Sequence, residues 1–357
     1  MALTTGHDCE CAIGVIDDLL VGAGLGALVK RSQLDPLNGR DFVVLVERMA
    51  RTLWRIAEPN ETAAKSKALT ELDLDWKALT VPQRNAAIEA AGRAMQATAT
   101  GILPRLDLAF EAESVKITRG TKFRAVRRWE LGIEQSLSTT DERIADAIRS
   151  STTNYVTDAY GRRNEAFSEM AREVVARGVS QGLDRNAIGQ QLHEKMGGSD
   201  LARGKPYFTT VAAQFMARGR GDTLISTFSE ARIAKFQWLS VMDERTTLPC
   251  RMLNGRVFST SYAMATVERS IQLTRPEDIS EARPMLQEGR DDEGQYVYYE
   301  KNGSEHIVGR VVRSGVGNKD DAGEWSNVSP ISALEGAGAA TPPAHFRCRS
   351  TIIPYLL

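Results

Sequence analysis

Hydrophobic side chains recur at three- and four-residue steps through much of the first two thirds of the chain, the spacing that places them on one face of a helix. A first helix is expected to have Asp41 as its N-cap residue, and its apolar face is formed by Phe42, Val43, Leu45, Val46, Met49, Leu53 and Trp54. Pro82 suits the first turn of a second helix, which continues through an alanine-rich stretch to Thr98. The pattern from Cys11 to about Thr100 therefore predicts helices whose role is packing.

A longer helix is predicted from Asp141 to about Arg177, with an apolar stripe formed by Ile144, Ile148, Tyr155, Ala159, Phe167, Met170 and Val174. We expect Gly178 to end this helix, and Asp184 to cap a shorter helix that stops at Gly197-Gly198. The end of the long helix, the turn after it and the short helix together have two interpretations: a DNA-reading helix-turn-helix or a plain helical hairpin. The second helix holds few basic residues for a DNA groove, which favours the hairpin.

The hydrophobic period changes after a further helix predicted over residues 206–234. Residues 236–243 have the aromatic and β-branched character of a strand, and the segment around Val257 is its expected partner across a turn at Asn254-Gly255. A second hairpin is predicted around Asn302-Gly303, and residues 335–343 read as a small-residue linker. The predicted fold class is α+β, with a mostly helical N-terminal region followed by a small mixed α/β C-terminal module of short strands and hairpins.

We expect three segments along the chain. A helical region of unknown role covers residues 1–135, a helical segment over 136–235 leads into the module, and the module itself covers 236–357. An acidic insert at about 261–340 interrupts the module. The length of 357 residues is sufficient for two domains.

Composition narrows the class of protein. The chain is 42% hydrophobic and 25% charged, as in ordinary globular proteins, and 45 Lys and Arg against 46 Asp and Glu exclude a uniformly basic nucleic-acid binder. Four cysteines exclude a dense disulfide scaffold, and the first ten residues lack the basic region of a secretory signal. The apolar stretch from Ala12 to Val29 is too short after Asp17-Asp18 to cross a bilayer, so we expect no membrane partner. With few cysteines and no secretory signal, we expect synthesis in a reducing cytoplasm.

The even charge balance conceals opposed patches. Residues 201–260 hold nine cations and four anions, whereas residues 261–340 hold eight cations and fourteen anions. We hypothesise that the acidic insert shields or orients the basic part of the module. A third, basic run contains no acidic residue and carries Lys116, Arg119, Lys122, Arg124, Arg127 and Arg128. This run is either a solvated basic face or a contact surface for DNA phosphates or an acidic partner.

The most informative residues lie in two segments about a hundred positions apart. The first segment contains Trp238, Asp243, Arg245, Thr246, Cys250, Leu253 and Gly255, and the second contains Pro342, His345, Cys348, Arg349 and Pro354. This arrangement resembles the C-terminal module of the phage Mu F-like head morphogenesis family, also known as minor head proteins, over roughly residues 150–357. Many members of that family carry two further cysteines, at the positions where this chain has Thr247 and Ser350.

The resemblance implies a minor capsid protein of a tailed phage or prophage, located in the virion head near the portal vertex. Its implied partners are the portal protein, other head proteins and double-stranded DNA, and its implied action is in head assembly and in DNA packaging or ejection. Residues that would hold the module together are Trp238, Asp243, Arg245, Thr246, Gly255 and Arg349. Two alternatives stay open: a phage-encoded enzyme or toxin that carries such a module, and a DNA-binding regulator that uses the helix pair around Asp184.

Cys250, His345 and Cys348 form a candidate zinc site. The His-x-x-Cys spacing lets two side chains reach one ion, and Cys250 supplies a third ligand from the other segment. Because a structural zinc site has four ligands, a water, Asp243 or a partner chain would complete it. Two other interpretations stay open: His345 bonds to the backbone while the cysteines are small buried hydrophobes, or Cys250 and Cys348 form a disulfide in the mature particle.

Two further features bear on chemistry. The N-terminal group of His7, Cys9 and Cys11 is interpreted as part of a mobile tail rather than as a second metal site. The sequence contains no HExxH helix, no Gly-rich phosphate loop and no paired carboxylates on one short segment. We therefore expect Asp243 and Arg245 to brace the structure, by pairing with Arg349 or capping a turn, and we expect no enzymatic activity.

Overall fold

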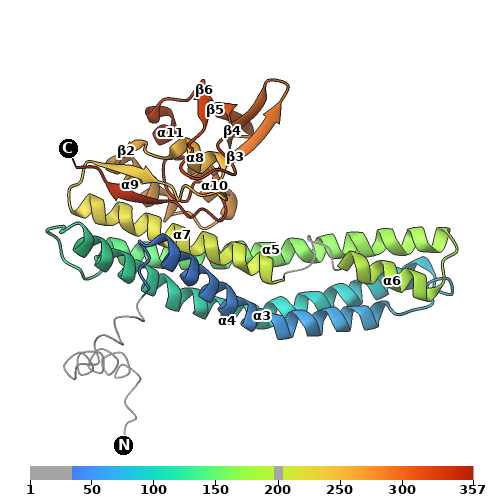
Figure 1. Cartoon of the computed structure of the whole chain (residues 1–357). Coiled ribbons are helices and arrows are strands. Elements are labelled where there is room, and N and C mark those ends of the chain that lie inside the picture. The colour runs from blue at the N-terminus through green and yellow to red at the C-terminus, as the bar shows by residue number, and fades with distance from the viewer. Residues whose placement is uncertain (1–33, 197–203, 357) are drawn as a thin grey trace, which may run out of the picture.

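The computed structural model describes residues 34–196 and 204–356. Four long helices lie side by side in an elongated bundle: α3 (Gly39–Leu72), α4 (Val81–Arg128), α5 (Thr139–Ser180) and α7 (Lys205–Glu230). The short helix α6 (Arg185–Met196) packs on α3 and α5 at one end of this bundle, and the strand-containing module lies over α7 (Figure 1). The helical N-terminal part and the small mixed C-terminal module confirm the predicted α+β class.

The helix starts and ends differ in places from those predicted. Asn38, not Asp41, is the N-cap of α3, because its Oδ1 accepts the backbone N–H groups of Arg40 and Asp41. Pro82 lies in the first turn of α4 as predicted, but this helix continues past Thr98 to include the whole basic run. The continuation follows from buried apolar residues that keep the three- and four-residue spacing: Ile102, Leu106, Phe110 and Ile117.

Gly178 is not the end of the third predicted helix. Helix α5 runs on to Ser180, and a Cβ atom at Gly178 would lie 2.5 Å from Ile188 Cγ1 of α6. The glycine therefore permits close packing between the two helices instead of stopping one. Asp184 caps α6 as predicted, with its Oδ1 accepting the Ala187 N–H at 2.8 Å. The predicted stop at Gly197-Gly198 lies outside the described residues.

Helices α5 and α6 form a hairpin whose second helix faces the bundle. The buried face of α6 consists of Ile188, Leu192 and Met196, which join a hydrophobic cluster at this end of the bundle. On the outer face, Arg185 is ion-paired with Asp73, with Nη2 and Oδ2 2.5 Å apart. This arrangement agrees with the plain hairpin and offers few basic side chains for a DNA groove.

The module is built on a three-stranded antiparallel sheet. Strand β1 (Lys235–Leu239) pairs with β2 (Val257–Ser259) on one side and with β7 (Thr351–Pro354) on the other. The predicted strand over residues 236–243 is confirmed in its first half, and the chain leaves the sheet at Ser240. The short helix α8 (Leu248–Leu253) occupies the β1–β2 connection, and Gly255 follows it with φ +79°.

The acidic insert forms a compact unit of its own elements. It contains α9 (Thr260–Ser270), α10 (Pro276–Ala282) and a four-stranded sheet made of β3 (Leu286–Asp291), β4 (Gly294–Lys301), β5 (Ser304–Arg313) and β6 (Glu324–Ser326). The predicted hairpin is confirmed: Asn302 and Gly303 join β4 to β5, and both have positive φ, at 52° and 67°. Acids of this unit pair with its own arginines, as Asp291 does with Arg310 and Asp321 with Arg313.

One hydrophobic core runs through the bundle and the module. It includes Phe42 of α3, Phe110 of α4, Phe215 of α7 and Trp238 of β1, each at most 1% exposed. Residues 335–343 are a buried connection rather than an exposed linker. The first three of these residues form the last turn of α11 (Ile331–Ala337). Ala339 and Ala340, which follow, are buried in this core. No described helix is long and apolar enough to cross a membrane.

Candidate metal centre

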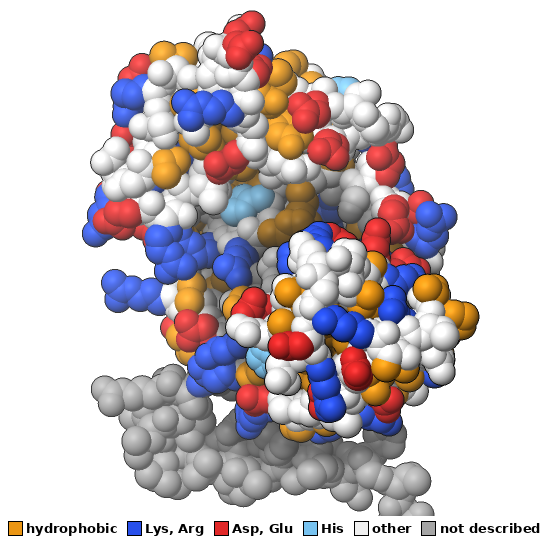
Figure 2. Space-filling model, turned by 90° about the vertical axis from the view of Figure 1, so that its right-hand side faces the viewer, with side chains coloured by type: hydrophobic (Ala, Val, Ile, Leu, Met, Phe, Trp, Pro, Cys, Tyr) orange, Lys and Arg blue, Asp and Glu red, His pale blue; other side chains and the backbone are white. Residues whose placement is uncertain are grey.

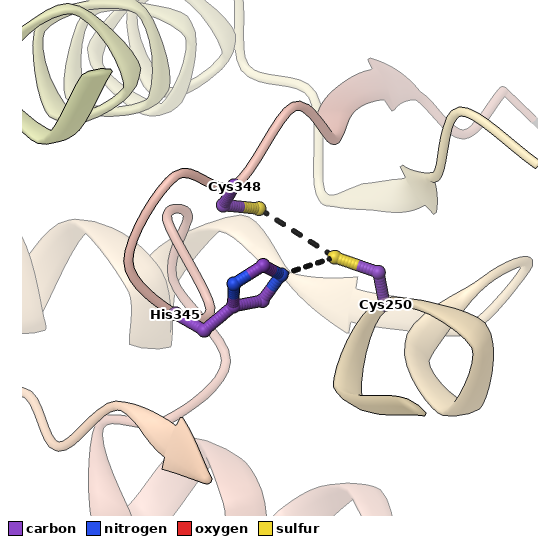
Figure 3. A group of neighbouring side chains, drawn as sticks. All are labelled: Cys250, His345 and Cys348. Carbon is purple, nitrogen blue, oxygen red and sulfur yellow. Dashed lines mark hydrogen bonds between the residues drawn. The ribbon is translucent and has the colours of Figure 1, made fainter. Parts of the chain in front are cut away.

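Pairing of β1 with β7 brings the two distant segments of the sequence together. Trp238 of β1 lies opposite Ile352 of β7, and both side chains are completely buried. Cys250 lies on α8, which follows β1, while His345 and Cys348 lie on the loop that precedes β7. Figure 3 shows the three side chains pointing toward one another from these two elements. The candidate zinc ligands predicted from spacing are therefore neighbours in space.

The ligand atoms of Cys250, His345 and Cys348 all lie within 4.8 Å of one another, so this group could hold a metal ion. The two sulfurs are 3.6 Å apart and the thiols are free, and Cys250 Sγ lies 3.0 Å from His345 Nε2. On a tetrahedral zinc ion, two thiolates lie about 3.8 Å apart, and a thiolate and an imidazole nitrogen about 3.6 Å. The distance between the two sulfurs already fits a zinc ion. The His345 imidazole would have to move about half an ångström away from Cys250 Sγ to make room for the ion.

The ring of His345 is oriented as in many metal-binding histidines. Nδ1 lies 2.7 Å from the carbonyl oxygen of Phe346, which requires that Nδ1 carries the proton and donates it. In the neutral ring, Nε2 then keeps its lone pair and faces Cys250 and the Thr247 hydroxyl. A backbone carbonyl that fixes the tautomer in this way is a usual partner of a metal-binding histidine.

Protons are distributed unevenly among the three groups. Hydrogen bonds from Cys250 and then from His345 lower the pKa of the Cys348 thiol well below its usual range, although burial opposes this. The contact with Cys348, together with burial, raises the pKa of Cys250. Burial alone would lower the pKa of His345, but its interaction with Cys348 outweighs burial and raises it. Zinc binding would release protons from this cluster, because the ion takes thiolates and a neutral imidazole as ligands.

Both positions at which the sequence departs from the resembled motif also belong to this cluster. Thr247 Oγ1 lies 2.9 Å from His345 Nε2, and the Ser350 hydroxyl donates to Cys250 Sγ at 3.0 Å. Ser350 Oγ also lies 3.1 Å from Ser240 Oγ, and Ser240 donates to the Cys250 carbonyl at 2.7 Å. Hydroxyl groups therefore occupy the places of the two additional cysteines.

Asp243 is not placed to be the fourth metal ligand. Its two oxygens each accept a hydrogen bond from Arg349 at 2.6 Å, and Oδ1 also accepts the Arg245 N–H and the Thr246 hydroxyl. The Arg349 contact holds the pKa of this carboxyl far below its usual range. The expectation that Asp243 pairs with Arg349 and caps a turn is confirmed, whereas a water or a partner chain fits the fourth ligand position better.

A cavity of about 250 Å³ gives access to the cluster. It is lined by Cys250 and His345 together with the guanidinium-bearing residues Arg245, Arg347 and Arg349. In a view along the bundle, a hollow separates the module above from the bundle below, and Lys and Arg side chains gather at its left margin (Figure 2). The predicted motif residue Arg245 is exposed and lines this cavity, while Thr246 is buried with its hydroxyl against the Val241 carbonyl.

Two arginines that the sequence analysis did not single out brace the centre. Arg251, next to Cys250 on α8, is 1% exposed and donates to carbonyl oxygens of Thr246, Asp243, Asn318 and Asp321. Arg220 of α7 is 2% exposed and donates to the carbonyls of Arg349 and Ser350. The only sequence signal for Arg251 is its charge within the apolar segment LPCRML. Arg251 thus links the first segment to the insert through two backbone carbonyls, and the hypothesis that the insert shields or orients the basic part of the module stays a prediction.

Only part of the basic run of α4 is exposed to solvent. Lys122 is completely buried, and its Nζ lies 2.7 Å from both Asp141 Oδ2 and Glu230 Oε2. The prediction of Lys122 as a contact residue is therefore wrong, because its charge is used to join three helices. Arg128 is exposed but pairs with Asp35 at 2.9 Å. The cations that line a groove on the outer side of α4 are Lys116, Arg119 and Arg124, and Arg127 lies over the Phe123 ring beside it.

The N-terminal group of His7, Cys9 and Cys11 lies outside the described residues. No family model, curated protein or solved structure matches the chain.

Proposed function

We propose that this chain is a minor head protein of a tailed phage or prophage, which associates with the portal and acts in head assembly and in DNA packaging or ejection. The proposal is supported above all by the assembly of the two resembled segments into a single centre. Asp243 of the first segment pairs with Arg349 of the second, and Cys250 meets His345 and Cys348. Convergence of residues from two segments a hundred positions apart supports their belonging to one module.

A zinc ion held by Cys250, His345 and Cys348 would give the module a covalent-like link between α8 and the loop before β7. The ion would neutralise the two thiolates. It would also add a link between the two segments, which the sheet joins through only four residue pairs between β1 and β7. Its role in this proposal is structural. The protein supplies the orientation, since the Phe346 backbone carbonyl fixes the imidazole and the Ser350 hydroxyl bonds to Cys250.

The exposed stripe on α4 is proposed to contact DNA phosphates or an acidic surface of another head protein. Lys116, Arg119, Phe123 and Arg127 follow one another at three- and four-residue steps and so share one helical face. The guanidinium of Arg127 lies 5.3 Å from the centre of the Phe123 ring, which holds a cation and an aromatic ring together at the surface. Contacts of this kind give binding that weakens as the salt concentration rises.

The proposal is tested in particles rather than in the isolated chain. A phage whose genome encodes a tagged copy of the protein is grown, and its lysate is fractionated on a density gradient. The protein is then quantified in DNA-filled heads by mass spectrometry. We expect a fixed low copy number that co-purifies with the portal protein. A matched lysate carries Asp243→Asn, which we expect to lower the amount in heads. Absence of the unmodified protein from heads, with normal amounts free in the lysate, would contradict the proposal.

A further inference from the structure

A second cavity, of about 150 Å³, lies between α5, α7 and α10. Most of the residues that surround it are apolar, including Tyr155 of α5, Val211 and Phe215 of α7, Ile279 of α10 and Met285 after it. An apolar cavity of about this volume accepts a group of the size of benzene. The cavity is therefore large enough for one small organic group.

Unpartnered polar atoms gather at one wall of this cavity. Gln214 and Arg218, one turn apart on α7, both line it. Gln214 Oε1 and the Nε and Nη2 atoms of Arg218 are buried and have no hydrogen-bond partner among the described residues. Arg218 uses only Nη1, which donates to Ser151 Oγ at 3.0 Å. Buried polar groups normally have partners, so the Arg218 guanidinium, whose Nη2 has none and whose Nε has only a distant carboxylate, points to a ligand group that accepts from it.

Positive charge is also in excess at this wall. Asp222 is fully buried, and both of its oxygens accept hydrogen bonds from Arg283, at 2.6 and 3.0 Å. The same carboxylate lies 3.5 Å from Arg218 Nε, so one negative charge serves two guanidinium groups. Within residues 34–196 and 204–356, no other carboxylate is within ion-pair distance of Arg218. Burial lowers the pKa of Arg218 to about 10, which leaves it charged at neutral pH.

We propose that this cavity is a binding site for a carboxylate attached to a benzene-sized apolar group. The carboxylate would pair with Arg218 and balance the excess charge, and a turned Gln214 amide would donate to it. The apolar group would lie against Tyr155, Phe215 and Met285. A free organic acid and the C-terminal residue of a partner chain offer the same chemistry. Phe346 lines both this cavity and the one beside the Cys–His cluster, but the cavity contains none of the three candidate metal ligands, and the proposal does not depend on the proposed function.

The test compares two ligands of the same shape on the unmodified full chain. In isothermal titration calorimetry, 3-phenylpropanoate is expected to bind with saturable 1:1 stoichiometry, and its neutral isostere 3-phenylpropanamide at least about tenfold more weakly. Arg218→Gln is expected to remove the preference for the acid. Ser280→Phe, at an exposed position that lines the same cavity, is expected to abolish binding of both ligands by filling the space.

The proposal is overturned if neither ligand binds saturably, if the acid and the amide bind equally, or if Ser280→Phe leaves binding unchanged. The comparison of acid with amide needs no variant, so a folding defect in Arg218→Gln does not affect it. A short peptide that ends in phenylalanine, tested with a free and with an amidated C-terminus, distinguishes the two sources of the ligand. Tighter binding of the free-carboxylate peptide than of 3-phenylpropanoate assigns the site to a chain terminus.

Discussion

Asp243 and Arg349 form a two-point ion pair across more than a hundred positions of sequence, with both N–O distances at 2.6 Å. Each residue belongs to one of the two segments that build the candidate metal centre. The pair is partly shielded from water, since 27% of the Asp243 side chain and 20% of the Arg349 side chain are exposed. Bidentate carboxylate–guanidinium pairs of this kind fix orientation as well as contribute free energy.

Replacement of Asp243 by Asn is predicted to lower the free energy of unfolding by about 1–2 kcal/mol, because Arg349 loses its charged partner while water still reaches the site. Urea unfolding followed by circular dichroism measures this difference. Glu244→Gln is the matched control. Glu244 is exposed and lies 3.7 Å from Lys319, and its loss is expected to cost at most about 0.5 kcal/mol. Equal effects of the two substitutions would contradict the account.

The same variant has a defined pH dependence. The pKa of Asp243 is lower in the folded protein than in the unfolded chain, because Arg349 and then Thr246 stabilise its charged form. The stabilisation is therefore fully present above the unfolded value of about 3.9 and is lost as the pH falls toward the lower folded value. The difference between the wild type and Asp243→Asn should be constant from about pH 5 to 8 and close only below about pH 4. A difference that disappears between pH 7 and 5 would assign it to another group.

Substitution of Lys122 by Met is predicted to destabilise the bundle by about 3–5 kcal/mol, because it leaves the completely buried Asp141 without its cation. Thermal and urea unfolding measure the loss. Arg119→Met, on the exposed face of the same helix, is expected to change stability by no more than about 0.5 kcal/mol. Normal stability of Lys122→Met combined with weaker partner binding would restore Lys122 to the contact surface.

Gly178→Ala is predicted to lower stability by about 1–3 kcal/mol, since the new Cβ would lie 2.5 Å from Ile188 Cγ1. Gly161→Ala is the control on the same helix. No atom lies within 4 Å of a Cβ built at Gly161, so helix propensity alone applies and stability should rise by up to about 1 kcal/mol. One unfolding assay measures both variants, and stability changes of opposite sign would support the close approach of α5 and α6. A gain of stability in both variants would rule out that close approach.

Local sequence signals predicted the elements well and their limits poorly. The apolar period located α3 and α5, Pro82 with the alanine-rich stretch located the first part of α4, and Asn302-Gly303 identified its hairpin. Gly178 was misread because a helix-ending glycine and a glycine at a helix contact look alike in sequence, and only the position of Ile188 separates them. Likewise Asn38 and Asp41 are both good N-cap residues, and the structure alone decides between them.

The candidate centre was predictable because its residues have chemically distinctive side chains. Cys250, His345 and Cys348 suggested a common ion from type and spacing, and the β1–β7 pairing that unites them agrees with that prediction. Arg251 and the burial of Lys122 were not predictable. Arg251 bonds to the carbonyl of Asn318, and Lys122 bonds to Glu230. Both partners are far away in sequence, so no local pattern reveals them.

Ser350→Cys is predicted to tighten zinc binding at least about tenfold, because it places a third thiolate, as a fourth ligand, where a hydroxyl now lies 3.0 Å from Cys250 Sγ. Competition with a chromophoric chelator measures the dissociation constant. Ser350→Ala removes the same hydroxyl without adding a ligand and is expected to change the affinity by less than about threefold. An equal change in both variants would show that the position acts through packing rather than coordination.

Zinc content of the purified full chain tests the central claim most directly. Elemental analysis of protein purified without chelators should find close to one zinc per chain, lost in Cys348→Ser and kept in a Cys9→Ser, Cys11→Ser double variant. Removal of the metal should also lower the midpoint of thermal unfolding. Metal-free protein with full native stability, or zinc that follows Cys9 and Cys11 instead of Cys348, would contradict the account.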